Sequence, residues 1–167
     1  EALATEGLQV DQLTPQDQHL AQVILIKSLQ AQGRARHARE RLDSALRSPH
    51  ASPPNAARAT LLSLLGDHLA LTGEWDEAHK VLEESLNIAT ALNHDDLLCE
   101  VHNAIGGLNL DKGQLDLARS HFQLAIDNPA RGADARWQAG LLGNLALAEH
   151  QSGNLASAEL HYQQALT

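Results

Sequence analysis

The chain has 167 residues, is rich in alanine and leucine, and contains only 2% aromatic residues. This composition favours helix over sheet. The formal net charge of −9 argues against a general affinity for nucleic acid or anionic membranes. No apolar run approaches the roughly 18 residues that span a bilayer, and the N-terminus lacks the features of a signal peptide. Because Cys99 is the single cysteine, no intrachain disulfide can form, and we expect a reducing, cytoplasmic setting.

The first part of the chain contains a clear helix start. The sequence has no methionine, so we expect a segment of a longer protein, with residues 1–13 as the tail of a preceding repeat or a linker. Thr14 is the expected N-cap of the first helix, followed by Pro15 in the first turn and Asp17 three residues after the cap.

Three further junctions follow. Residues 48–54 (SPHASPP) predict a loop, after which Asn55 caps the next helix. Residues 93–95 and the pair Asn128–Pro129 mark the later junctions. These positions divide the chain into four expected repeats of one domain, at residues 14–54, 55–93, 94–132 and 133–167.

Glycine recurs at a fixed interval of 40 residues, and an alanine stands five residues after each of these glycines. Such self-similarity is the signature of a repeat architecture. Each glycine supplies the backbone freedom of a tight turn between two helices. The glycines are Gly33, Gly73, Gly113 and Gly153, and the alanines are Ala38, Ala78, Ala118 and Ala158.

Large and small residues alternate around each turn, as in closely packed antiparallel helices. Position −8 from the glycine is apolar (Leu25, Leu65, Ile105, Leu145), and position −7 is small in three units (Ile26, Gly66, Gly106, Ala146). Position +9 is large (Leu42, Leu82, Phe122, Tyr162), and position +12 is small (Ala45, Ser85, Ala125, Ala165). The first unit departs from this pattern at two positions. Ile26 occupies the small position −7, and Ala35 stands where the later units have the larger residues Trp75, Leu115 and Leu155. We expect Trp75 to lie in the core.

This pattern, from about Gln18 to Leu166, resembles the tetratricopeptide repeat. The resemblance implies an all-α, right-handed superhelical solenoid of four antiparallel helix pairs. The usual unit has about 34 residues. The 40-residue unit is therefore more similar to the longer-repeat branch of kinesin light chains, polarity adaptors and bacterial regulators of the maltose-activator type.

The resemblance also implies a binding face, because the first helix of each pair lines the concave side in this family. The expected partner-binding residues are Val23, Lys27, Gln30, Ser63, Asp67, Ala70, Asn103, Gly107, Leu110, Gly143, Asn144, Leu147 and His150. Asn144 stands in an Asn-Leu-Ala string, where the family's asparagines hydrogen-bond a ligand's backbone. The alternative is a solvated or inter-helix role for Asn144, and for Asn103 still more so. Only Lys27 fits the family's basic clamp for a terminal carboxylate, so we expect no such clamp.

Four glycines lie inside the predicted helices, where glycine costs about 1 kcal/mol relative to alanine. For Gly106 we favour a packing role. At Gly107 and Gly143 the missing side chains either serve packing or let a ligand approach the backbone in the groove. At Gly140 we expect only fraying of the helix end.

Charge is unevenly spread along the chain. The arginines Arg34, Arg36, Arg39, Arg41 and Arg47 crowd one stretch, whereas residues 74–100 are strongly acidic. This distribution indicates either a bipolar surface that steers a partner or, as we favour, solvated outer faces with pairs inside each helix.

Recognisable catalytic chemistry is missing from the sequence. No two of the ten histidines are three or four residues apart, so a helical metal-ligand pair is missing. His121 and His161 occupy equivalent positions and could be neighbours across the stack. Cys99 is expected to be a buried structural thiol. We expect no enzyme, no metal site and no cofactor.

Two functions remain. The first is a non-catalytic scaffold that binds a peptide or helix of a protein partner in the groove. The second is a ligand-sensing or oligomerisation segment of a bacterial signal-transduction or transcription regulator. Nucleic acid and membrane are not expected partners, and self-association through the terminal repeats stays open.

Overall fold

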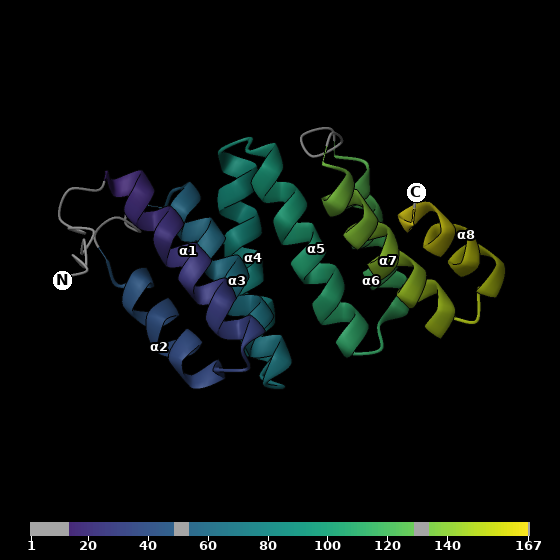
Figure 1. Ribbon diagram of the computed structural model, residues 1–167, viewed down its shortest axis with the longest axis horizontal. Coiled ribbons are helices and arrows are strands. Elements are labelled where there is room, and N and C mark those ends of the chain that lie inside the picture. The colour runs from purple at the N-terminus through teal and green to yellow at the C-terminus, as the bar shows by residue number, and fades with distance from the viewer. Residues whose placement is uncertain (1–13, 49–53, 129–133, 167) are drawn as a thin grey trace, which may run out of the picture.

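The computed structural model describes residues 14–48, 54–128 and 134–166, and in these ranges it contains eight α-helices and no strand (Figure 1). Consecutive helices pair along the chain, so the described part is an array of antiparallel pairs. This confirms the expected all-α solenoid of helix pairs. The helices are α1 (Pro15–Ala31), α2 (Ala35–Leu46), α3 (Ala56–Leu71), α4 (Trp75–Ala91), α5 (Asp95–Asp111), α6 (Leu115–Ile126), α7 (Ala135–Gln151) and α8 (Leu155–Ala165).

The repeating glycines make the turn inside each pair. All four have φ between 69° and 83°, a conformation that side chains rarely adopt. At the first turn Gly33 donates its backbone N–H to Gln30, and Arg34 donates to Leu29. These two bonds form a Schellman motif, which recurs at the other three glycines. The turn between α4 and α5 has the same bonds around Asn93, whose φ is 47°.

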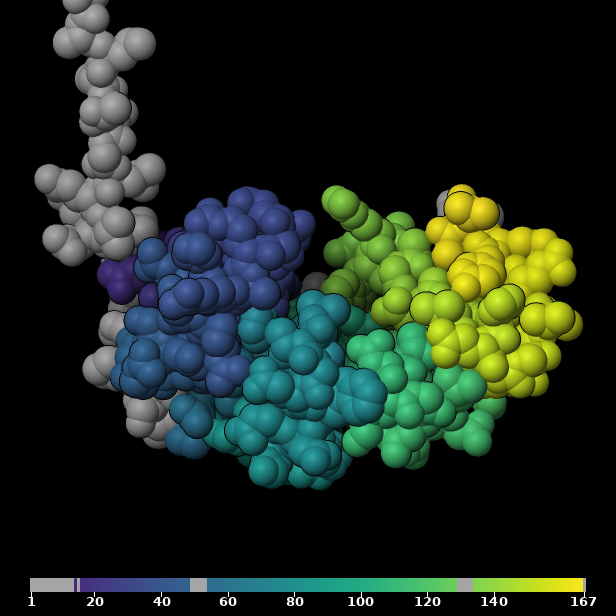
Figure 2. Space-filling view, turned by 90° about the horizontal axis from the view of Figure 1, so that it is seen from below, coloured from purple at the N-terminus to yellow at the C-terminus, as the bar shows by residue number. Residues whose placement is uncertain are grey.

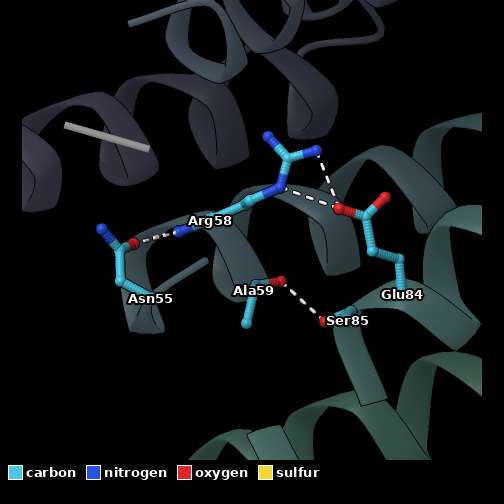
Figure 3. Close-up of polar contacts among 5 residues, drawn as sticks. All are labelled: Asn55, Arg58, Ala59, Glu84 and Ser85. Atoms are coloured by element: carbon cyan, nitrogen blue, oxygen red, sulfur yellow. Dashed lines mark hydrogen bonds and ion pairs between the residues drawn. The ribbon is translucent and has the colours of Figure 1, made fainter. Parts of the chain in front are cut away.

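Side-chain caps start the helices where the sequence indicates. The hydroxyl of Thr14 accepts a hydrogen bond from the Asp17 N–H, and the Asn55 side chain accepts one from Arg58 (Figure 3). Both predicted caps are confirmed. Asp134 caps α7 in the same way and was not anticipated. Residues 1–13, the loop core at 49–53 and Pro129 lie outside the described residues.

Small residues on one helix receive large residues of its partner. A Cβ added to Gly106 would lie 2.5 Å from the Phe122 ring, and a Cβ at Gly66 would collide with Leu82. The packing role expected for Gly106 is therefore confirmed. A buried hydrogen bond of 2.7 Å from the Ser85 hydroxyl to the Ala59 carbonyl also joins α3 to α4 (Figure 3).

The core runs along the array. One cluster joins α1 to α5 and includes Ile26, Leu42, Leu82 and Val101. Others continue it through Phe122 of α6 to α7. Each pair thus buries its apolar stripe against its neighbours, as expected for a solenoid.

One expectation about packing is wrong. Trp75 is 42% exposed, because it is the first residue of α4 and lies beside the turn. The first repeat also departs from the others, as its sequence indicates: Leu25 is 42% exposed, whereas Ile26 is 1% exposed. This repeat therefore buries a branched side chain where the next two repeats have glycine.

Candidate functional site: the face of the first helices

The candidate site is the concave side of the array of helix pairs, which the first helix of each pair faces. Figure 2 shows the molecule in profile, hollowed on one side between the N-terminal helices, in blue, and the C-terminal helices, in yellow. Helices α1, α3 and α5 line two depressions, and α7 continues the row of first helices (Figure 1).

The predicted partner-binding residues differ in exposure. Two of them, Val23 (9% exposed) and Ser63 (6% exposed), are buried and offer a ligand little surface. Val23 belongs to the main core cluster, although it also lines the larger depression. Lys27, Leu147 and His150 are exposed, and Gln30, Asp67, Ala70, Asn103, Gly107, Leu110, Gly143 and Asn144 are partly buried.

The larger depression has a volume of about 680 Å³. On α1 it is lined by His19, Leu20, Val23 and Lys27, and it extends over the N-terminal turns of α3 and α5. Burial lowers the pKa of His19 below its ordinary value. Of the predicted residues, the larger depression contains Val23 and Lys27.

The smaller depression, about 300 Å³, brings together four of the predicted residues from three helices. Gln30 comes from α1, Asp67 and Ala70 from α3, and Gly107 from α5. The Gln30 side chain also donates a hydrogen bond of 3.3 Å to the Leu64 carbonyl, which ties α1 to α3 beside the depression.

Among the described residues, Asp67 has the most strongly shifted pKa. Burial raises the pKa of its carboxyl group to about 7, Lys27 opposes this rise, and Glu100 adds to it. The residue keeps some exposed surface, yet burial is the largest cause, so its carboxyl group lies in a dense surrounding of protein atoms. Burial also raises the pKa of Asp111, which lines the same depression.

An amide pair connects α5 to α7. The Asn144 Nδ2 donates a hydrogen bond of 2.9 Å to the Asn103 Oδ1. The inter-helix role that was the alternative for Asn144 is therefore present. Among the described contacts the Asn144 Oδ1 and the Asn103 Nδ2 have no further partner, so one acceptor and one donor group remain available.

Charged residues on the second helices mostly pair within their own helix. Arg36 pairs with Glu40 and Arg39 with Asp43 on α2, and Lys80 pairs with Glu77 on α4. Between helices, Arg58 of α3 lies 2.8 Å from Glu84 of α4 (Figure 3). These pairs support the interpretation of solvated outer faces.

The histidines pair differently from the expected arrangement. His121 stands 3.1 Å from His102 between their Nδ1 atoms, whereas His161 contacts Glu149 at 2.7 Å. Burial lowers the pKa of both His102 and His121, and His121 further lowers that of His102. Within the described residues no group of three or more His, Cys, Asp or Glu side chains could hold a metal ion.

Cys99 is fully buried, as predicted. Its Sγ accepts a hydrogen bond of 3.1 Å from the Trp137 indole and lies 3.3 Å from the Ala125 carbonyl oxygen. These contacts place the thiol in the packing between α5, α6 and α7.

Sequence reasoning missed several residues of the smaller depression, namely Leu71, Ala104, Leu108 and Asp111. On α5 it selected positions 103, 107 and 110, whereas the depression uses 104, 107, 108 and 111. Positions 104, 108 and 111 are three or four residues from Gly107 or from each other and so share its helix face. Which face of α5 points to the depression depends on how α5 packs against its neighbours, and the sequence alone does not give that rotation.

The fold and this face define a helical-repeat protein made of stacked antiparallel pairs. Residues 57–130 match the family model of the tetratricopeptide repeat. A search of curated proteins found no match.

Among solved structures, the chain is similar to BtubC (BKLC) from P. vanneervenii, with 18% identity and a TM-score of 0.73. The similarity covers 93% of this chain and 66% of that one, so the chain spans about two thirds of the BtubC structure. At this identity the likeness concerns the fold. Among the described helices, none has the length and apolar character needed to cross a bilayer.

Proposed function

We propose that this segment is a non-catalytic scaffold that binds an extended peptide or a helix of a protein partner along α1, α3, α5 and α7. The observation that carries the proposal is the Asn103–Asn144 pair, whose remaining amide groups can bind a peptide backbone irrespective of its sequence. The buried thiol of Cys99, the single cysteine, is compatible with the reducing, cytoplasmic setting that we include in the proposal.

The test is a selection from a random peptide library, followed by fluorescence anisotropy on synthetic versions of the selected peptides. Asn144→Ala should weaken binding about fivefold to tenfold, because one hydrogen bond contributes about 1 kcal/mol. The matched control is Asn87→Ala, which removes an exposed asparagine from the outer helix α4. Circular dichroism verifies that both variants stay helical.

Three results would contradict the proposal or its site. Failure to select any peptide argues against peptide binding. Equal affinity of wild type and Asn144→Ala for the peptide would mean that the peptide binds elsewhere than at the amide pair. Loss of helicity in Asn144→Ala identifies its role as structural.

A second candidate is the ligand-sensing segment of a larger bacterial regulator. The observation that favours it is the larger depression, whose volume of about 680 Å³ is in the range of small-molecule sites. A thermal-shift screen of metabolites tests it. A stabilising compound whose effect disappears in Lys27→Ala would support it, and a screen without any stabilising compound would oppose it.

Self-association is a further part of the proposal. Tyr162 is 40% exposed, although its counterpart Phe122 is fully buried, and Leu155, seven residues earlier on the same face of α8, is 61% exposed. A second copy could cover this apolar face. Light scattering after size-exclusion chromatography tests this, because Tyr162→Ser should shift a dimer to monomer. A wild-type monomer at all concentrations would contradict self-association.

A further inference from the structure

We propose that the smaller depression between α1, α3 and α5 binds the cationic side chain, arginine or lysine, of a partner peptide. This inference rests on the proposed function and specifies the chemistry of the partner. Residues of α1, α3 and α5 line this depression on the concave side of the array.

The shape of the depression suits a long, narrow side chain. Small residues pave it, since Ala70, Ala104 and Gly107 come from α3 and α5. A Cβ built on Gly107 would meet nothing within 4 Å, so the space above this glycine is open. Leu71, which is 78% exposed, supplies apolar surface for the aliphatic stem that both lysine and arginine carry.

The charge of the depression suits a cation. Asp67 and Asp111 both line it. The other charged groups that act on Asp67 are Lys27 from α1 and Glu100 from α5. Two carboxyl groups therefore line the space, whereas Glu100 and Lys27 line the larger depression and are opposite in sign, so the balance favours a cationic occupant over an anionic one.

Asp67 provides a second, independent argument. Its carboxyl group is crowded by protein atoms but still reaches solvent in the depression, and no described hydrogen bond or ion pair reaches it. Lys27 influences it only at a distance beyond ion-pair contact. A crowded carboxylate is poorly solvated, and an incoming guanidinium or ammonium group would supply the partner that the protein itself does not.

The experiment uses the peptides selected by the whole chain. Each lysine or arginine of a selected peptide is replaced in turn, arginine by the uncharged citrulline and lysine by norleucine. On wild type, one of these replacements should weaken binding about tenfold or more. Asp67→Asn should reduce this difference, its combination with Asp111→Asn should abolish it, and Lys27→Gln should bind the cationic form more tightly than wild type does. Glu83→Gln, an exposed substitution on α4, is the matched control and should bind like wild type.

The outcomes separate the two proposals. If peptides bind and depend on Asn144, but no basic residue in them matters, the cationic pocket is wrong and the proposed function stands. The same conclusion follows if Asp67→Asn distinguishes the charged from the uncharged peptide as strongly as wild type does. If no peptide is selected at all, both proposals fail. Circular dichroism and thermal melting show whether Asp67→Asn is folded; if it is not, Lys27→Gln decides, because unchanged affinity in that variant overturns the pocket.

Discussion

The ring of Phe122 lies directly against the backbone of Gly106, so that even one added methyl group would come within 2.5 Å of the ring. Phe122 is fully buried at the centre of the third helix pair. The distance between α5 and α6 is therefore set by the absence of a side chain at position 106. This relationship explains why the small position before the turn and the large position after it recur together.

Gly106→Ala should accordingly destabilise the protein, although alanine is the better helix former. We expect the free energy of unfolding to fall by about 1–3 kcal/mol, as for other overpacked cores. Gly107→Ala is the control, because its Cβ would meet nothing within 4 Å. That variant should be unchanged or up to about 1 kcal/mol more stable. Urea unfolding of the two variants measures the difference, and equal behaviour of both would contradict the packing argument.

Ala118→Leu tests the same helix pair from the other side. Ala118 is fully buried on α6 in the cluster that contains Phe122. Three additional carbon atoms should cost about 1–3 kcal/mol. The adjacent Leu117 is 52% exposed, so Leu117→Ala should change the melting temperature little. An unchanged melting midpoint in Ala118→Leu would show that position 118 tolerates volume and that the close packing of the pair is wrong.

The sequence was sufficient to predict the helix pairs because the backbone demands of the turns are local. A glycine at positive φ and a capping Thr14 or Asn55 act within a few residues, whatever packs around them. The binding face is harder to predict, because the rotation of each helix depends on its neighbours. Ser63 was expected on the groove yet is buried, and Asp111 was missed yet lines the smaller depression. Trp75 was placed in the core by its size, although it begins α4 beside an open turn.

Asp67 should make stability depend on pH. Its pKa is raised from 3.8 to about 7 in the folded protein, so the folded state binds a proton more tightly than the unfolded state does. Its contribution to stability is therefore present in full below about pH 4 and is lost as the pH rises to about 7. Between pH 5.5 and 8 wild type should lose about 2 kcal/mol through this group, whereas Asp67→Asn should not. Urea unfolding at both pH values checks this, and parallel pH profiles of wild type and variant would contradict it.

The most informative stability test concerns Glu149 and His161, which contact each other at 2.7 Å between α7 and α8. The positions 80 residues earlier in the repeat hold Leu69 and Val81, which pack in the main core cluster. The fourth repeat thus has a largely buried polar pair where the second has an apolar one.

His161→Val should lower the free energy of unfolding by about 1–3 kcal/mol, because Glu149 would then be buried without its partner. Adding Glu149→Leu recreates the pair of the second repeat and should restore stability to within about 1 kcal/mol of wild type, or exceed it, since an apolar pair avoids the desolvation of two polar groups. A double-mutant cycle by urea unfolding measures the coupling between the two positions. Additive effects would mean that the contact contributes nothing. A double variant less stable than His161→Val would mean that the fourth repeat cannot accept the packing of the second.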